Sequence, residues 1–208
     1  MQFTRVWICA RRRHHDGVLL GASTKGRLLL AAPPLLDPNF ARSVVLMLEH
    51  SENGALGLVL NRPSYEETVP GLEAWEQLVA PPSVVFGGGP VDTDALIGLA
   101  RAEQPSGEHG FAALAESPMP SGLGTVDLEL PPDEVASGFS GLRIFRGYAG
   151  WGSGQLDAEL QLGGWIVLPA EPEDVFTEEP EGLWRRVLAR QPGRLAWLAN
   201  CPDDLSWN

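Results

Sequence analysis

The residues best suited to chemistry lie in one glycine-rich segment, GYAGWGSGQLDAEL, at residues 147–160. Tyr148 and Trp151 offer large aromatic surfaces, and a helix-like stretch follows them. On that helix Gln155 and Glu159 are four residues apart and would share one face. Aromatic walls beside an amide and a carboxylate are typical of a small-molecule pocket. The same pattern suits a structural corner, in which the rings fill the core and the glycines permit close packing.

Other short motifs do not match known catalytic or metal-binding patterns. Ser153 in GWGSG lies one residue short of the G-x-S-x-G pattern of a hydrolase nucleophile. FGGGP, at residues 86–90, is not followed by the Lys-Ser or Lys-Thr pair of a phosphate-binding loop, so it indicates a tight turn. The histidines and cysteines show no pair at metal-ligand spacing. The sequence therefore predicts no metal site and implies no cofactor.

A second candidate contact lies where an apolar run ends at Asn61-Arg62-Pro63. Asn61 can bond to local backbone, and Pro63 stops a strand. Arg62 could contact a carboxylate or a phosphate, because the guanidinium group pairs with both. It could equally be an exposed arginine at the end of a strand.

Short apolar runs separated by turn residues predict more strands than helices. Asn53-Gly54 lies between two such runs and predicts a hairpin. We expect strands at 26–33, 42–50, 55–63, 125–130, 141–151 and 164–170, and a strand followed by a glycine turn within 83–91. Residues 94–101 fit a strand, with a helix as the alternative. We expect helices at 71–80, 154–163 and 179–191, a helical turn after 132, a long loop at 102–122 and a C-terminal tail. Because the helices do not alternate regularly with the strands, the expected fold class is α+β.

The charge distribution limits the class of partner. The chain has 208 residues and a net charge of −12, but residues 1–27 hold six of the fifteen basic residues and one acid. The acidic body would repel a phosphate backbone, so direct nucleic-acid binding by it is not expected. No apolar run approaches the roughly 18 residues of a membrane span. We expect a cytoplasmic protein, with 1–22 as a flexible extension and 23–208 as one domain.

Several segments, taken in order, resemble the YqgE/AlgH family. They are GRLLLAAPPLLDPNFARSVVLMLEHSENGALGLVLNRP, FGGGPV, FRGYAGWGSGQLDAEL, GWIVLPAEPEDVF and LWRRVLAR, and together they span roughly residues 26–200. The resemblance implies an α+β fold with a small, closed, β-barrel-like core and a branched mixed sheet surrounded by helices. It implies no established activity, although the AlgH name suggests transcriptional regulation. The N-terminal extension and the third glycine of FGGGP depart from the family pattern.

Three hypotheses for function follow. The leading one is a non-catalytic binding or regulatory module for a small ligand or a protein partner, with oligomeric state left open. Its surface would consist of Asn61, Arg62, Gly88, Pro90, Tyr148, Gly150, Trp151, Gln155 and Glu159. The second is an enzyme in which Glu159 acts as general acid or base beside Arg62. The third is a transcription-linked regulator that uses the RRR motif at 11–13.

Overall fold

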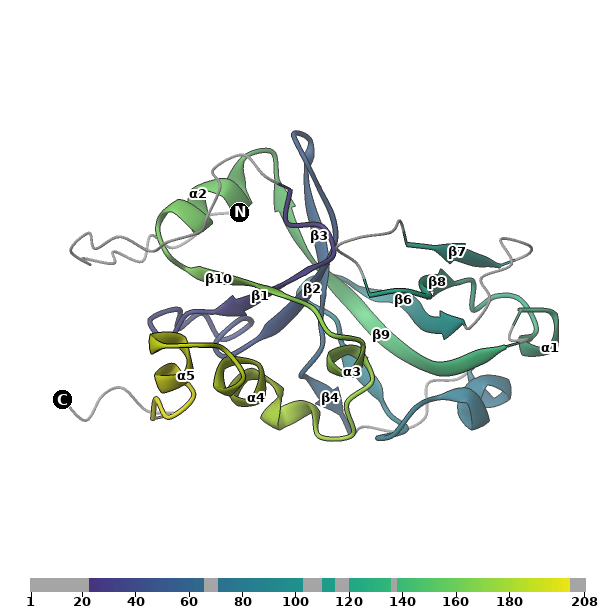
Figure 1. Ribbon diagram of the computed structural model, residues 1–208. Coiled ribbons are helices and arrows are strands. Elements are labelled where there is room, and N and C mark those ends of the chain that lie inside the picture. The colour runs from purple at the N-terminus through teal and green to yellow at the C-terminus, as the bar shows by residue number, and fades with distance from the viewer. Residues whose placement is uncertain (1–22, 66–70, 103–109, 115–119, 136–137, 203–208) are drawn as a thin grey trace.

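A computed structural model describes residues 23–65, 71–102, 110–114, 120–135 and 138–202, so the predicted extension at 1–22 lies outside the described residues (Figure 1). The strands within these ranges are β1 (Arg27–Ala31), β2 (Val44–Ser51), β3 (Gly54–Val59), β4 (Pro63–Ser64), β5 (Val85–Gly87), β6 (Val91–Ala102), β7 (Phe111–Ala113), β8 (Leu123–Val126), β9 (Phe139–Gly152) and β10 (Trp165–Pro169). The helices are η1 (Glu73–Leu78), α1 (Pro132–Val135), α2 (Gln155–Gln161), α3 (Pro172–Val175), η2 (Pro180–Gly182), α4 (Leu183–Ala189) and α5 (Arg194–Leu198). The protein is therefore β-rich, with short helices.

The long strand β9 connects the two halves of the sheet. The strands follow the order β10-β1-β2-β3-β9-β6-β8-β7, and β5 pairs with both β4 and β9. The β5–β9 pairing is parallel, whereas β9 pairs antiparallel with β3 and β6. This confirms a branched, mixed sheet. The sheet curls into a half-barrel (Figure 1), and the described end strands β10 and β7 do not pair with each other, so the described sheet does not close into the barrel-like core that the resemblance implies.

Residues 28–31 of β1 and 44–48 of β2 are apolar and buried because both faces of the sheet are covered there. Leu29, on β1, and Val45, on β2, belong to a core cluster that also receives Leu156 from α2. Leu28 and Leu46, their neighbours along the chain, belong to the opposite cluster with the buried face of α4. Figure 1 shows α2 apart from α3, α4 and α5, which gather near β1 and β10. Continuous apolar runs in the sequence therefore correspond to two-sided burial.

Four predicted elements differ from the observed ones. The helix predicted at 71–80 is the shorter 3₁₀ helix η1, because Val79 takes extended backbone and bridges β9. The strand predicted at 125–130 is β8, which ends at Val126, since the Asp127 carboxylate accepts the Glu129 N–H in a turn. β7 lies within the segment predicted as a loop, and α5 lies within the predicted tail. The hairpin is confirmed, but its turn residues are Glu52 and Asn53.

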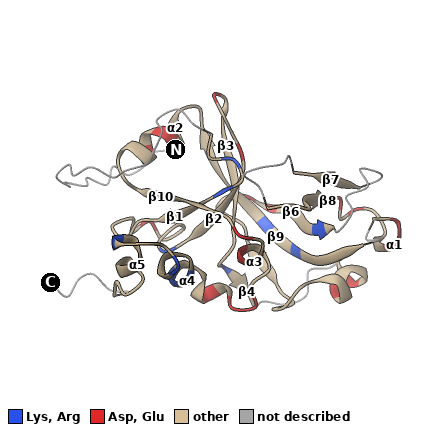
Figure 2. Cartoon of the chain, in the orientation of Figure 1, with Lys and Arg blue, Asp and Glu red and all other residues tan. Residues whose placement is uncertain are grey.

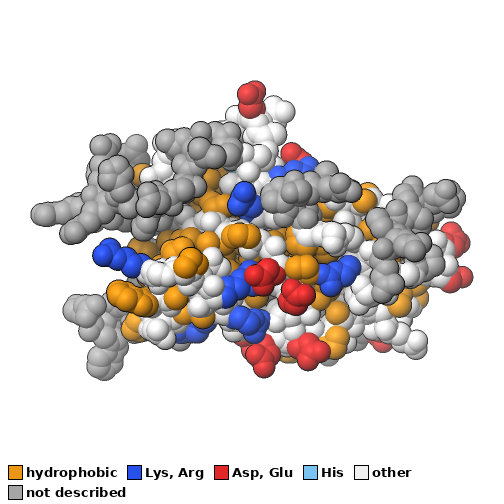
Figure 3. Space-filling model, viewed as in Figure 1, with side chains coloured by type: hydrophobic (Ala, Val, Ile, Leu, Met, Phe, Trp, Pro, Cys, Tyr) orange, Lys and Arg blue, Asp and Glu red, His pale blue; other side chains and the backbone are white. Residues whose placement is uncertain are grey.

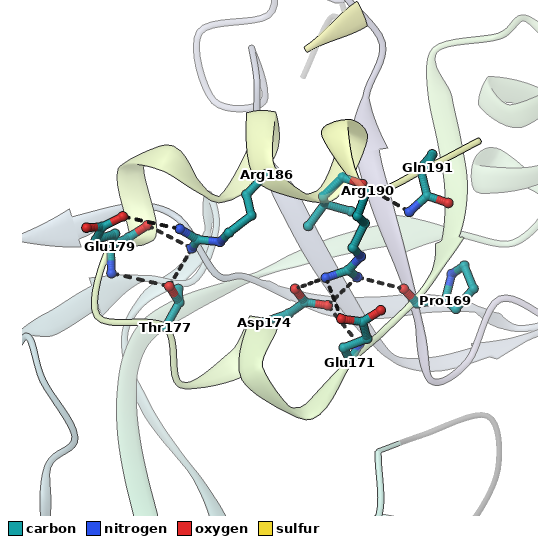
Figure 4. A network of polar contacts seen from close by, with 9 residues as sticks. Pro169, Glu171, Asp174, Thr177, Glu179, Arg186, Arg190 and Gln191 are labelled. Carbon is teal, nitrogen blue, oxygen red and sulfur yellow. Dashed lines mark hydrogen bonds and ion pairs between the residues drawn. The ribbon is translucent and has the colours of Figure 1, made fainter. Parts of the chain in front are cut away.

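Two arginines hold the C-terminal helices against the sheet. Arg143, on β9, is fully buried and donates to the carbonyls of Pro81, Val175 and Thr177. Burial without a described carboxylate partner lowers the pKa of Arg143 to about 10. Arg190 follows α4 and donates to both carboxylate oxygens of the buried Asp174, at 2.6 and 2.7 Å (Figure 4). These contacts fix α3 and α4 relative to β9.

Candidate functional site

The hairpin turn and the glycine-rich corner after β9 lie side by side. Gly54 pairs with Gly152 in the β3–β9 ladder, and the Ser153 hydroxyl donates to the Glu52 carbonyl at 2.6 Å. Gly54 has φ +135°, and a Cβ there would lie 2.4 Å from the Trp151 carbonyl oxygen. A glycine is required at position 54 for this close backbone approach. The two motifs that the sequence analysis singled out therefore meet at one end of the sheet.

The FGGGP segment forms a second close backbone contact with β9. Gly88 accepts a hydrogen bond from Val59 and donates one to Arg146, so it lies between β3 and β9. A Cβ on Gly88 would lie 2.2 Å from the Gly147 carbonyl oxygen. Pro90 follows and is exposed. The FGGGP glycines therefore permit close backbone contact with β3 and β9, whereas the sequence predicts only a tight turn.

Glu159 binds two tryptophan side chains and one amide. Its Oε2 accepts the indole N–H groups of Trp151, at 3.0 Å, and Trp165, at 2.8 Å. Its Oε1 accepts from the Gln155 amide at 3.0 Å, and the Gln155 carbonyl oxygen in turn accepts the Gly152 N–H at 3.1 Å. Both carboxylate oxygens are thus occupied by donors from β9, α2 and β10.

The indole rings belong to the core on this face of the sheet. Trp151 is only 6% exposed, stacks on Phe40 at a centroid distance of 6.1 Å and meets Trp165 edge-on at 5.9 Å. Tyr148, three residues earlier on β9, packs against the opposite cluster, and its ring lies 3.2 Å from the position of a Cβ on Gly150. The aromatic residues of the motif therefore point to different faces.

Asn61 and Arg62 bind the segment that joins β1 to β2. The buried Asn61 side chain accepts the Val44 N–H and donates to the Arg42 carbonyl, each at 2.9 Å. The half-buried Arg62 guanidinium donates to the Ala41 carbonyl. Burial lowers the pKa of Arg62 from its ordinary value, because the charged form loses hydration. Both side chains are therefore held in place by the 32–43 segment.

Asn61 and Arg62 line a hollow of about 390 Å³ that sequence reasoning did not find. Its lining comes from the 32–43 segment, the connection between β3 and β4, η2 and the start of α4, and comprises Pro33, Leu35, Leu36, Ala41, Arg42, Asn61, Arg62, Glu181, Trp184 and Arg185. We call this hollow the arginine hollow. Arg42 lies over the Trp184 ring, 4.6 Å from its centroid, which is a favourable cation–π geometry. Leu36 is 67% exposed at this site.

The arginine hollow concentrates positive charge in an acidic protein. Residues 28–208 contain nine basic and 26 acidic residues, and three of those nine line this one hollow. Figure 2 shows basic residues on α4 and β9, with acidic residues spread over other elements. Figure 3 shows basic and hydrophobic side chains together over the region of α4 and α5. One acid, Glu181, also lines the hollow, and it accepts a hydrogen bond from the Tyr65 hydroxyl at 3.2 Å.

The nine predicted surface residues therefore fall into separate groups. Asn61 and Arg62 line the arginine hollow, whereas Glu159 is absent from its lining. Trp151, Gln155 and Glu159 form the hydrogen-bonded group beside α2. Gly88 and Pro90 belong to the FGGGP segment, and Tyr148 and Gly150 to the middle of β9. The 32–43 segment contacts two groups, through Phe40 on Trp151 and the Ala41 carbonyl on Arg62.

Within the described ranges, no set of three or more His, Cys, Asp or Glu side chains is arranged to hold a metal ion. None of the helices in these ranges has the length and hydrophobicity that a membrane-crossing helix requires.

These features define a β-rich protein built around one long, glycine-containing strand that pairs with three neighbours. A family model described as AlgH-like matches residues 28–196, and the chain belongs to this AlgH-like family. A UPF0301 protein from Streptomyces coelicolor is 50% identical over 194 residues, which cover 93% of this chain and 100% of that protein. A UPF0301 protein from Mycobacterium leprae is 45% identical, covering 88% and 90% of the two chains.

Solved structures share this fold. The crystal structure of protein DIP2367 from Corynebacterium diphtheriae has a TM-score of 0.76 and 32% identity, and the match covers 84% of this chain and 91% of that one. The solution structure of the AlgH protein from Pseudomonas aeruginosa has a TM-score of 0.64 and 31% identity, with coverage of 90% and 96%. The resemblance inferred from the sequence is thereby confirmed at the level of family.

Proposed function

We propose that this chain is a non-catalytic, cytoplasmic binding module, and that its arginine hollow takes an acidic segment of a partner protein. The observation that carries the proposal is the convergence of Arg42, Arg62 and Arg185 on one hollow with apolar walls. Guanidinium groups pair with carboxylates through two parallel hydrogen bonds, each stronger than a neutral one. The Leu36 and Trp184 side chains would contact apolar residues that flank the acids.

Arg62 is the best-positioned anchor. Among the described residues it donates to main-chain carbonyls, of Asn61 at 3.5 Å and of Ala41, and to no carboxylate. A half-buried guanidinium with these partners has given up hydration without gaining an opposite charge. An incoming carboxylate would supply that charge, so the hollow favours an acidic ligand over a neutral one.

The chemistry of Glu159 supports a binding role over an enzyme. Three N–H groups already occupy its two oxygens, and they stabilise a fixed carboxylate. An enzyme that uses Glu159 with Arg62 would need both groups in one cleft, but only Arg62 lines the arginine hollow. The lining contains no histidine, cysteine or serine that could act as a nucleophile.

Calorimetric titration of the full chain with an acetylated Leu-Asp-Asp-Leu peptide tests the proposal. We expect saturable binding that Arg62→Gln weakens about tenfold or more, since a hydrogen bond to a charged group contributes roughly 1.5–3 kcal/mol. The matched control is Arg146→Gln, which removes an exposed arginine of β9 outside the hollow. Equal affinity for the Leu-Asn-Asn-Leu peptide, or unchanged affinity in Arg62→Gln, would refute the proposal.

A further inference from the structure

One acid, Glu181, stands among the described residues that line the arginine hollow. It belongs to the short helix η2 and is exposed. Its Oε1 accepts a hydrogen bond from the Tyr65 hydroxyl at 3.2 Å, and Tyr65 is itself 67% exposed. The wall of the hollow therefore carries a carboxylate beside an accessible aromatic ring, in addition to its arginines.

Other acids near the C-terminal helices are paired with arginines. Asp174 pairs with Arg190 at 2.6 Å, and Glu179 pairs with Arg186 at 3.5 Å (Figure 4). Within the described ranges no basic side chain forms an ion pair with Glu181, although three arginines line the same hollow. Its negative charge is therefore not used by these residues, and it acts on whatever enters the hollow.

Arg62 and Glu181 place opposite charges a short distance apart in the hollow. Tyr65 follows Arg62 by three residues, so their Cα atoms are at most about 11 Å apart. Because the Tyr65 hydroxyl contacts Glu181, this distance also limits how far the carboxylate lies from the Arg62 backbone. An extended peptide covers such a length with about three residues. An acidic and a basic side chain that are neighbours in one segment can therefore reach both charges.

We infer that Glu181 determines the specificity of the arginine hollow, which selects a partner segment that carries a basic residue beside its acidic one. The inference rests on the proposed binding function and narrows the class of partner. The acid of the segment pairs with Arg62, and the base pairs with the Glu181 carboxylate and lies against the Tyr65 ring, which attracts a cation. A second acid in place of the base faces Glu181 and is repelled, so the same residue selects against it.

Calorimetric titration of the full chain with three acetylated peptides tests the inference. They are Leu-Asp-Asp-Leu, Leu-Asp-Lys-Leu and Leu-Lys-Asp-Leu, of which the last two carry an acid and a base in the two possible orders. We expect the better of these two to bind about threefold to fivefold more tightly than Leu-Asp-Asp-Leu, which is the contribution of an exposed ion pair. Glu181→Gln should remove this preference. The matched control, Glu178→Gln, removes the same charge from an exposed acid outside the lining and should retain it.

The outcomes separate this inference from the proposed function. Equal affinity of the unmodified chain for all three peptides overturns the inference. A preference that survives in Glu181→Gln, or that falls equally in Glu181→Gln and Glu178→Gln, also overturns it, because the general negative charge of the protein then explains the preference. In these cases, loss of Leu-Asp-Asp-Leu binding in Arg62→Gln leaves the binding function standing. Absence of saturable binding of any of the three peptides refutes the proposed function, and the inference with it.

Discussion

The substitution Glu159→Gln tests whether the glycine-rich motif is a structural corner. The Glu159 carboxylate accepts three N–H donors, two from indoles at 2.8 and 3.0 Å and one from Gln155 at 3.0 Å. A glutamine has one acceptor oxygen and one NH₂ group at the same positions. In either orientation its NH₂ group faces a donor, because Gln155 already uses its own oxygen to accept the Gly152 N–H.

The expected cost follows from these contacts. Each of the three bonds changes from a charged to a neutral acceptor, and at least one is lost with two donors left facing each other. Glu159 is half-buried, so solvent reduces the effect. We expect a loss of about 2–3 kcal/mol in the free energy of unfolding, which is roughly a 30-fold or larger shift in the unfolding equilibrium.

Urea unfolding followed by tryptophan fluorescence measures this loss, and near-ultraviolet circular dichroism reports the packing of Trp151 and Trp165. The control is Glu134→Gln, because Glu134 is exposed on α1. We expect the control to unfold like the unmodified protein. A Glu159→Gln variant with unchanged stability and unchanged near-ultraviolet spectrum would refute the structural role of this carboxylate.

Three further substitutions and one control test the packing that positions the site, each by urea unfolding. Gly88→Ala would place a Cβ 2.2 Å from a carbonyl oxygen of β9 and should cost more than about 3 kcal/mol. The control Gly182→Ala should be near neutral, because φ is negative there and a Cβ would meet only the Arg186 side chain, at 4.0 Å. Arg143→Ala removes a buried guanidinium that donates to three carbonyls, of which that of Val175 is in a buried bond, and should cost about 3 kcal/mol or more. Asp174→Asn removes the buried carboxylate that pairs with Arg190 and should cost about 2–3 kcal/mol (Figure 4). Stability near that of the unmodified protein in Gly88→Ala, Arg143→Ala or Asp174→Asn would refute the structural role given to that residue.

Much of the strand framework could be predicted from the sequence because local signals are strong there. The apolar runs of β1, β2 and β3 and the turn residues between them place these strands nearly where they are observed. The register of the β2–β3 hairpin could not be predicted. The sequence places the turn at Asn53 and Gly54, but the turn lies at Glu52 and Asn53, and Gly54 instead pairs with β9. A pairing with a strand about one hundred residues away is invisible to a local pattern.

Only part of the candidate site could be predicted from the sequence, because the rest depends on contacts between residues far apart in the chain. Gln155 and Glu159 share a helix face, as their spacing indicates, and they do bond to each other. The second indole on Glu159, from Trp165, depends on the turn after α2. Arg42 and Arg185 carry no motif of their own, and only the folded sheet brings them to Arg62. An arginine at a strand end and a basic pair on an amphipathic helix are common surface features when seen separately.

The central claim, that the arginine hollow is the ligand surface, is tested most directly by nuclear magnetic resonance. The protein is titrated with the Leu-Asp-Asp-Leu peptide while the arginine Nε–H and tryptophan indole N–H signals are followed. We expect saturable shifts at Arg62, at the other hollow arginines and at the indole of Trp184. Shifts confined to the indoles of Trp151 and Trp165, with the signals of the hollow unchanged, would contradict the claim and assign the ligand surface to the corner beside α2.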